Sequence, residues 1–327
     1  MRRHRLVLAA VAAGLLLPLL PLFSPSASAF TTGDTSPYAP AIAECTDPSV
    51  FQGTKMGYVV FTGGDSLIHV IVFSPGNSAS WHGYTTSTHA ASAVSITCLN
   101  SGNSQRLLAT WRTSNGSVDV GQLVAANNHK GYGFLSVASP GATTGAAPAI
   151  ASNNTGYAVA WAGTDSQHHI NVWAGPNRGT FITTDYTRSG AGVSMIYTLG
   201  PSGAAYYLAW IAAVGTPHIY VGSFAGTTSL GAVVTSDYSP QAPIFDAANI
   251  DLVNSNSNIL LNWLGSTNKN FYIGAFDGTG NLGSSPYKAT GNAALAGYTD
   301  IGNSTPDCHD AFIDTANKLH IDEAFGC

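Results

Sequence analysis

One pattern of apolar and polar residues recurs along the chain. Its clearest copy runs from Gly156 to Asp165 (GYAVAWAGTD) and continues after a polar turn from Ile170 to Trp173 (INVW). Short apolar runs separated by a turn rich in Gly, Asn and Asp are typical of two paired β-strands. Further copies start near residues 57, 106, 206, 259 and 311. The chain is therefore expected to contain a series of similar β-hairpins.

An aromatic residue occupies the same position in each copy. These anchors are Phe61, Trp111, Trp161, Trp210, Trp263 and Phe312, at spacings of 50, 50, 49, 53 and 49 residues. A period near 50 in β-type sequence indicates the blades of a β-propeller, because one such unit cannot bury both of its faces alone. We therefore expect an all-β fold, a six-bladed β-propeller of four-stranded antiparallel blades with the anchors packed between them.

Two further strands are expected in each blade. A segment of small and apolar residues, such as 147–150, precedes the anchor hairpin and suits the innermost strand, while a Thr-rich segment, such as 181–187, follows it as the outer strand. The sixth copy ends at Cys327 without an outer strand, and residues 30–36 (FTTGDTS) resemble the missing one. We expect this N-terminal segment to complete the sixth blade and close the ring, which removes an exposed sheet edge. The alternative is an unpaired N-terminal tail.

The first 29 residues have the features of a secretory signal. A basic start is followed by an apolar run over residues 6–23 and by small residues at Ala27–Ala29. Pro18 and Pro21 would break the helix that a membrane anchor needs. We expect a signal peptide over residues 1–29, a single propeller domain over residues 30–327, secretion to the extracellular space and no membrane association of the mature chain.

Charge is scarce in this chain. Charged residues make up 9% of it, whereas a typical soluble domain has about 25%. The formal net charge is −5, and it becomes more negative when the basic leader is removed. This balance argues against binding to nucleic acid or to anionic membranes. We expect a monomer whose surface is rich in hydroxyl and amide groups.

Four cysteines in an exported chain predict disulfides. Cys45 and Cys98 end the predicted inner strands of the first two blades at matching positions, so we expect them to pair. Cys308 and Cys327 flank the last hairpin, and their pairing would fasten the end of the chain.

Several side chains are candidates for ligand binding. Asp65 and Asp165 recur at the hairpin turns, where each carboxylate either accepts sugar hydroxyls or caps its own turn. Trp81 and Trp173 are outside the anchor position and are therefore candidates for stacking on a sugar ring. Loops expected on the same face of the propeller contain further candidates: His168, Arg188 and Tyr238.

The sequence offers few motifs for metal binding or catalysis. His168 and His169 are adjacent, so on a strand they point to opposite faces and do not share one ion, and we interpret them as an exposed turn pair. Neither HExxH, paired CxxC nor GxSxG occurs, so no metal or other cofactor is expected. Paired carboxylates on inner strands can support glycoside hydrolysis, and the acidic residues predicted there are Glu44, Asp246, Asp251 and Asp300. Structural or solvated acids are the alternative.

The repeat motif at Trp161–Asp165 and Ile170–Val172 resembles that of bacterial secreted propeller proteins. It is broadly similar to the sialidase-like and fucose-lectin-like propellers, which bind or cleave glycans. Sialidases imply three arginines and Ser-x-Asp-x-Gly-x-Thr-Trp boxes, whereas the mature chain has none of these boxes and only the arginines Arg106, Arg112, Arg178 and Arg188. The Arg, Glu and aromatic set of fucose-lectin repeats does not recur either. The resemblance therefore implies the fold and neither sialidase activity nor fucose binding.

Two functional hypotheses follow. The first is a secreted, non-catalytic recognition module, lectin-like and binding a polysaccharide or a glycan surface. The alternative is a glycoside hydrolase or lyase that uses the carboxylates of the axial channel. A purely structural or protein-binding propeller stays open as a third interpretation.

Overall fold

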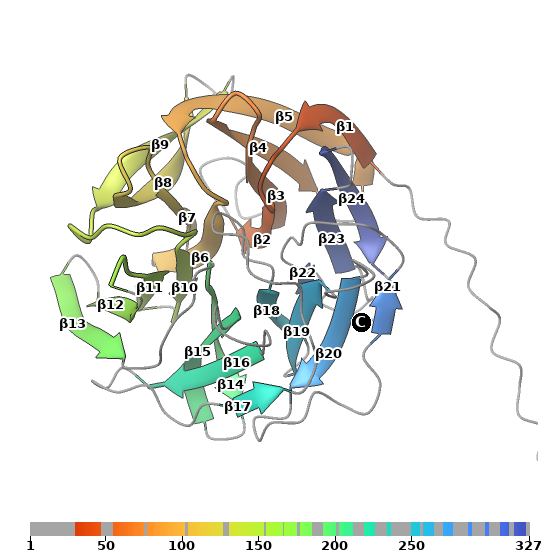
Figure 1. Ribbon diagram of the computed structural model, residues 1–327. Helices are drawn as coiled ribbons and strands as arrows, with labels where there is room; N and C mark the ends of the chain where they lie inside the picture. The colour runs from red at the N-terminus through yellow and green to blue at the C-terminus, as the bar shows by residue number, and fades with distance from the viewer. Residues whose placement is uncertain are drawn as a thin grey trace, which may run out of the picture.

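The computed structural model describes the β-strands and many of their connections (Figure 1). The described residues are 30–46, 55–74, 77–101, 104–126, 131–153, 155–165, 167–174, 177–184, 192–200, 203–211, 219–225, 234–236, 250–255, 258–264, 271–276, 287–289, 298–300, 308–313 and 317–324. Within these ranges, no helix is long and apolar enough to cross a membrane. The all-β class predicted from the repeat is confirmed for this part of the chain.

The described strands form six four-stranded antiparallel sheets, numbered here in chain order. Sheet 1 consists of β2 (Ala41–Thr46), β3 (Lys55–Thr62), β4 (Leu67–Ser74) and β5 (Asn77–His89). Sheet 2 consists of β6 (Ser95–Ser101), β7 (Ser104–Arg112), β8 (Val118–Ala126) and β9 (Gly131–Ala138). Sheet 3 consists of β10 (Ala149–Ser152), β11 (Gly156–Ala162), β12 (His168–Ala174) and β13 (Asn177–Thr184).

The remaining sheets follow the same strand order, except that the last one recruits the N-terminus. Sheet 4 consists of β14 (Ser194–Gly200), β15 (Gly203–Ile211), β16 (Ile219–Phe224) and β17 (Val234–Ser236). Sheet 5 consists of β18 (Ile250–Ser255), β19 (Asn258–Leu264), β20 (Phe271–Phe276) and β21 (Tyr287–Ala289). Sheet 6 consists of β22 (Tyr298–Asp300), β23 (Cys308–Ile313), β24 (Lys318–Ala324) and β1 (Phe30–Thr35).

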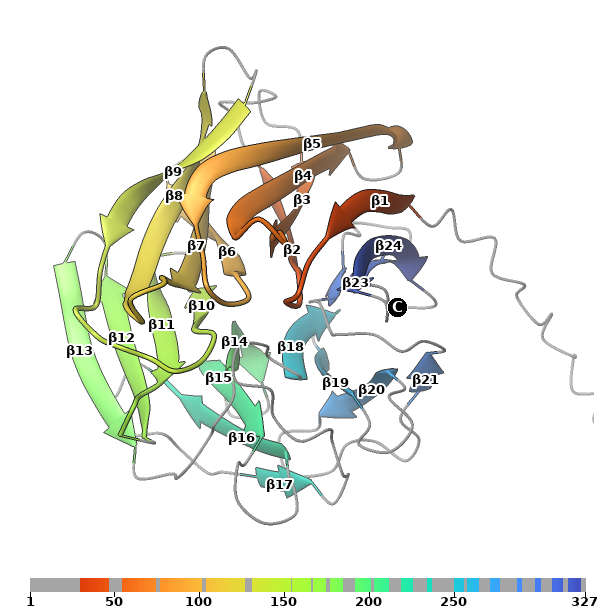
Figure 2. The same ribbon diagram turned by 45° about the horizontal axis from the view of Figure 1, so that its top comes forward.

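The sheets are arranged around a common centre, as Figures 1 and 2 show. The first strand of each sheet lies innermost and contacts the first strand of the next sheet, from β2 through β6, β10, β14 and β18 to β22, and β22 contacts β2. Small residues permit this approach: Ala39, Ala93 and Ala147, each just before an innermost strand, pack against one another. This agrees with the small residues predicted for the innermost strands.

Each middle strand contributes to two interfaces, because successive side chains point to opposite faces. On β4, Val70 packs in the cluster shared with sheet 2, whereas Ile71 packs in the cluster shared with sheet 6. The described anchor side chains are buried in such interfaces, as predicted: Phe61, Trp111, Trp161 and Trp210. Burial of both faces explains the nearly continuous apolar runs of the repeat.

The N-terminal segment pairs where the repeat predicts it. β1 runs antiparallel to β24, with Phe30 opposite Ile321 and Thr35 opposite Lys318. The Ser36 N–H donates to the carbonyl of Asn317, just before β24, at 2.9 Å, and the Ser36 hydroxyl donates to the Thr62 carbonyl in sheet 1 at 2.6 Å. The segment therefore joins the last sheet to the first, and the alternative of an unpaired tail is wrong.

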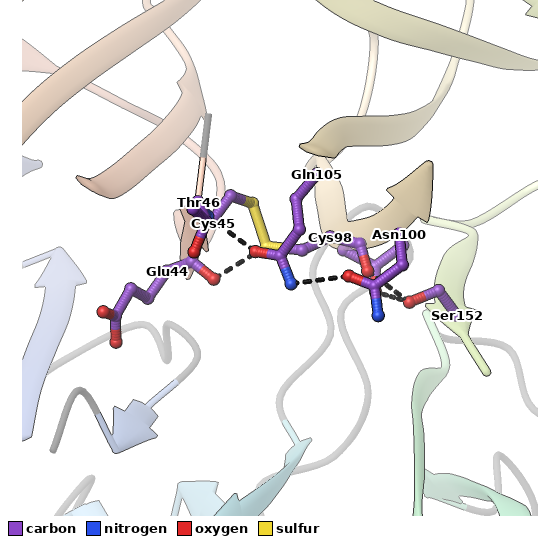
Figure 3. Close-up of a disulfide and its surroundings, with 8 residues drawn as sticks. Glu44, Cys45, Thr46, Cys98, Asn100, Gln105 and Ser152 are labelled. Atoms are coloured by element: carbon purple, nitrogen blue, oxygen red, sulfur yellow. Dashed lines mark hydrogen bonds between the residues drawn. A yellow bond between two sulfur atoms is a disulfide. The ribbon is translucent and has the colours of Figure 1, made fainter. Parts of the chain in front are cut away.

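The predicted Cys45–Cys98 disulfide is present between β2 and β6 (Figure 3), with the two Cα atoms 5.6 Å apart. Polar side chains continue the connection beside it. The Thr46 N–H donates to Gln105 Oε1 at 2.6 Å, and the Ser152 hydroxyl of sheet 3 donates to the Cys98 carbonyl. Cys327 and the side chain of Cys308 are outside the described residues, so their pairing stays a prediction.

Candidate functional site

Several of the predicted site residues lie outside the described part of the chain. Arg188, Tyr238 and Asp246 are among them, and only the backbone of Trp173, Asp251 and Asp300 is described. The candidates with described side chains are Asp65, Trp81, Asp165, His168 and Glu44.

Asp65 is part of a chain of three polar side chains on sheet 1. Its two carboxylate oxygens lie 3.1 and 3.3 Å from Nε2 of His69. His69 Nδ1 lies 3.2 Å from the hydroxyl of Thr85 on the outer strand β5. When Nε2–H donates to the carboxylate, a neutral ring leaves Nδ1 to accept from the Thr85 hydroxyl. The imidazole is thereby held in one orientation, with an exposed carboxylate on one side and an exposed hydroxyl on the other.

The same Asp–His pair recurs on sheet 3. Both oxygens of Asp165 lie 3.0 Å from His169 Nε2, and Thr183 is the cross-strand partner of His169, as Thr85 is of His69. Each histidine ring stacks on its anchor, Phe61 or Trp161, at centroid distances of 5.1 and 5.6 Å. In sheet 2 the residue opposite the anchor Trp111 is Asp119 and not a histidine. Of the first three sheets, only sheets 1 and 3 therefore have the Asp–His pair.

The carboxylates also cap their own turns, as one of the two sequence interpretations proposed. Asp65 Oδ1 accepts the Leu67 N–H at 3.0 Å, and Asp165 Oδ1 accepts the Gln167 N–H at 3.1 Å. Desolvation raises the pKa of each aspartate, but the backbone and histidine hydrogen bonds outweigh it, and both pKa values lie below the ordinary one. The side chains are nevertheless 47% and 52% exposed, so each ionised carboxylate still faces solvent.

Glycine makes room for these pairs. A Cβ at Gly63 would lie 2.5 Å from His69 Nε2 and 2.6 Å from Asp65 Oδ1, and the same two kinds of atom crowd Gly163. A larger residue at either position would push the carboxylate and the imidazole apart. The Gly–x–Asp spacing in the repeat is therefore the local requirement for the Asp–His pair.

The exposed-turn interpretation of His168 is wrong. Its side chain is completely buried and lies against Trp210 of sheet 4, with ring centroids 4.7 Å apart. Because β12 alternates, His168 faces sheet 4 while His169 faces the other way. His168 is therefore a core residue, inaccessible to a ligand. Among the described residues, no group of three or more His, Cys, Asp or Glu side chains is placed to hold a metal ion.

Trp81 lies on the same face of sheet 1 as His69. Its ring stacks on Phe73 with centroids 4.2 Å apart and planes inclined by 9°, and it is only partly buried. Gly57 lies beneath Phe73, where a Cβ would collide with the Phe73 ring, so this glycine sets the depth of the aromatic pair.

An exposed row of residues connects Trp81 to the Asp–His pair. Along β5, Gly83 lies opposite Ile71 and Thr85 lies opposite His69, and both are exposed. We call Trp81, Gly83 and Thr85, with His69 and Asp65 at the end of the row, the β5 strip. It joins two predicted candidates, Asp65 and Trp81, to three residues that were not predicted.

The missed residues had weak sequence signals. His69 lies opposite an anchor aromatic and four residues after the recurring Asp65, which a search for repeated polar pairs would have found. Gly83 and Thr85 lie on a long outer strand with irregular pairing to β4, since the register shifts between Leu67 and His69 and again near Ser74. Such bulges cannot be located from spacing alone.

Two of the four predicted channel acids occupy equivalent positions on their strands relative to the anchor aromatic. Glu44 pairs with Gly57, four residues before anchor Phe61, and Asp300 pairs with Cys308, four residues before anchor Phe312. The strands that hold them, β2 and β22, are in contact. Glu44 is on the same face of β2 as Ile42, which packs with residues of sheet 6, and Figure 3 shows its carboxylate pointing away from the disulfide.

Asp251 occupies a different level from these two acids. It pairs with Asn262, one residue before anchor Trp263. Along a strand this position is about 10 Å from the level of Glu44 and Asp300. Asp251 is therefore separated from Glu44 and Asp300 along the strand direction.

The comparisons with known proteins concern the fold. No family model and no curated protein matches the chain. AofleA from Arthrobotrys oligospora is 12% identical, with a TM-score of 0.59 over 92% of this chain and 87% of that one. The Aleuria aurantia lectin, described as a six-bladed β-propeller with a novel fucose recognition mode, is 14% identical, with a TM-score of 0.58 over 86% and 90%. The SapL1 lectin, solved with α-methyl fucoside, is 11% identical, with a TM-score of 0.54 over 89% and 97%. At these identities the likeness shows a shared β-propeller fold, and function has to be argued from the site.

Proposed function

We propose that this protein is a secreted, non-catalytic carbohydrate-binding propeller that binds polysaccharide or a glycan surface through the β5 strip. One observation carries the proposal: a partly exposed tryptophan shares a sheet face with an exposed carboxylate and an exposed hydroxyl. The signal peptide over residues 1–29 and a mature domain over residues 30–327 belong to the same proposal.

The chemistry of the strip suits a sugar. The face of Trp81 offers an apolar surface for the C–H face of a pyranose ring. Asp65 accepts hydrogen bonds from sugar hydroxyls, and the Thr85 oxygen, whose O–H donates to His69, accepts them as well. His69 fixes the position of both groups, so little side-chain entropy is lost when a ligand binds.

The similar proteins support the ligand class. The Aleuria aurantia lectin recognises fucose, and the SapL1 lectin was solved in complex with α-methyl fucoside. For this chain the proposal is limited to glycans, because the Arg, Glu and aromatic set of fucose-lectin repeats does not recur in its sequence.

The proposed architecture is a closed ring of six blades acting as a monomer. Its support is the cyclic contact of the innermost strands and the pairing of β1 with β24. The pairing of β1 covers the outer edge of β24. It also holds β5 and β1, the outer strands of neighbouring sheets, in fixed positions.

Binding can be tested with the mature chain and one matched pair of variants. Residues 30–327 are applied to a glycan array and to insoluble polysaccharides, together with Trp81→Ala and His82→Ala. We expect Trp81→Ala to weaken binding at least about tenfold, a loss of about 1.4 kcal/mol. His82 is exposed and points to the opposite face of β5, so its replacement is expected to leave binding unchanged. Absence of retained glycan, or equal effects of both variants, contradicts the proposal.

The register of Glu44 and Asp300 favours one second candidate, glycoside hydrolysis at the contact of sheets 1 and 6. A hydrolase requires two carboxylates flanking the scissile bond. Incubation of the retained polysaccharide with wild type, Glu44→Gln and Asp300→Asn distinguishes the two functions. Release of reducing ends that both variants abolish would establish the hydrolase, whereas the lectin proposal expects no release by any of the three.

A further inference from the structure

The β5 strip is longer than a single sugar. Trp81 and Thr85 are four residues apart on one strand, and Gly83 lies between them on the same face. Four steps along a strand span about 13 Å. Asp65 lies beyond this span, on the far side of His69, which bonds both Thr85 and Asp65. The apolar and polar ends of the strip are therefore too far apart for one pyranose ring to touch both.

The middle of the strip is open. A Cβ built at Gly83 has no heavy atom within 4 Å, and the residue is exposed. The glycines buried nearby differ, since a Cβ at Gly57 or Gly63 would collide with Phe73 or His69. The strand opposite Gly83 carries Ile71, which is buried. The centre of the strip therefore lacks a side chain of its own and borders a buried apolar residue of β4.

From this geometry we infer that the ligand of the β5 strip is an extended glycan of about two or three linked sugars, lying along β5 from Trp81 to Asp65, and not a single terminal sugar. The inference rests on the proposed function. One sugar stacks on Trp81, the chain passes over Gly83, and the hydroxyls of a further sugar bond Thr85 and Asp65. Contacts at both ends contribute to the binding free energy, so a monosaccharide, which reaches only one end, obtains only part of it.

The decisive variant fills the open centre. Gly83→Leu projects a side chain into the path of the ligand, and the backbone at Gly83 is outside the left-handed region, so a leucine fits without strain. Gly133→Leu is the matched control, because Gly133 lies on β9, the outer strand of sheet 2, and a Cβ there also has no atom within 4 Å. Gly83→Thr provides a smaller obstruction on the same strand. Thermal unfolding confirms that each variant is folded.

Calorimetric titration measures the outcome with a mono-, di-, tri- and tetrasaccharide series of the glycan retained in the array experiment. We expect wild-type affinity to rise at least about tenfold from mono- to trisaccharide and then to level off. Gly83→Leu is expected to lose at least about tenfold in trisaccharide affinity, Gly83→Thr less, and Gly133→Leu nothing.

Two results would overturn the inference, and they differ from failure of the proposed function. Equal affinity for monosaccharide and trisaccharide would place the whole ligand at one end of the strip. Normal trisaccharide binding by a folded Gly83→Leu variant would remove the ligand from the centre. In both cases glycan binding itself persists, whereas absence of binding at every chain length contradicts the proposed function and the inference together.

Discussion

Asn171 is a buried amide in an apolar interface. Its side chain is completely buried, and neither its nitrogen nor its oxygen has a hydrogen-bond partner. Opposite it lies Val159, which packs with Val118 and Val120 of sheet 2. Sheet 1 has the apolar Ile71 at the corresponding place, ten residues after its anchor. The burial of an unpaired amide costs about 1–3 kcal/mol.

Replacement of Asn171 by leucine, which has the same branching, is therefore expected to stabilise the protein by about 1–2 kcal/mol. Urea unfolding of wild type and Asn171→Leu checks this, and Ile71→Asn is the reverse control in sheet 1, expected to destabilise. A less stable Asn171→Leu variant would contradict the prediction, because it would mean that the amide is satisfied.

Asp119 occupies the position where sheets 1 and 3 have histidine. Burial raises its pKa, and a hydrogen bond from Ser139 offsets only part of that effect. Since the folded-state pKa lies above the unfolded value, the stabilising contribution is present below the unfolded pKa and is lost as the pH rises through the folded pKa. At neutral pH the ionised carboxylate of Asp119 therefore destabilises the folded state.

Asp119→Asn is accordingly expected to raise the Tm by about 1–3 °C at pH 7 and to leave it unchanged near pH 3. Asp165→Asn is the control with the opposite sign, since the pKa of Asp165 lies below its ordinary value. Its stabilising contribution is present above the unfolded pKa and is lost as the pH falls. Thermal unfolding followed by circular dichroism at both pH values measures the two effects, and equal shifts for the two variants would refute this assignment.

Among the strands, β1 has a special role because it joins two sheets that are distant in sequence. It pairs with β24, and the Thr35 carbonyl accepts the Gly64 N–H of sheet 1 at 2.9 Å. Without β1, the backbone groups of β24 form an open edge, which invites pairing with other chains. The stability of sheet 6 therefore depends on the first residues of the mature chain.

Deletion of residues 30–36 is expected to lower the free energy of unfolding by at least about 3 kcal/mol, since several hydrogen bonds of about 1 kcal/mol each are lost. The variant should also aggregate at concentrations where the mature chain does not. Unfolding and light scattering measure both effects, and a synthetic FTTGDTS peptide added in trans should partly restore the Tm. A scrambled peptide is the control. An undiminished stability of the deletion variant would show that β1 is dispensable.

For the whole molecule, the innermost strands and their cross-links hold the sheets together. Cys45–Cys98 joins sheets 1 and 2 covalently. Between sheets 2 and 3 the connection is made by hydrogen bonds, in which Ser152 bonds the Cys98 carbonyl and the Ile150 N–H donates to Ser95 Oγ at 3.2 Å. Of these two interfaces, the one between sheets 1 and 2 is therefore the one that a reductant can weaken.

Removal of this bridge by Cys45→Ala and Cys98→Ala, 53 positions apart in the chain, is expected to cost about 2–4 kcal/mol of stability. Denaturant unfolding with and without reductant measures it. Any further loss on reduction of the double variant would report the predicted Cys308–Cys327 bridge. A double variant as stable as oxidised wild type would contradict a stabilising role for Cys45–Cys98.

The sequence by itself determined the repeating architecture. The period near 50, the buried anchors, the completion of sheet 6 by residues 30–35 and the Cys45–Cys98 pair follow from apolar periodicity and from equal positions within successive repeats. These features are local, or they occupy the same position in every repeat, so a feature seen in one copy predicts its equivalent in the next.

The tertiary structure alone decided which side chains meet. It buried His168 against Trp210, left Asn171 without a partner, and brought Trp81, Gly83, Thr85, His69 and Asp65 onto one face of sheet 1. The physical reason is that a strand residue faces one neighbouring sheet or the other according to its register, and a single bulge exchanges the two faces. The period of the sequence specifies that a strand exists, whereas the bulges of β5, which set its face and therefore the candidate site, have no signature in it.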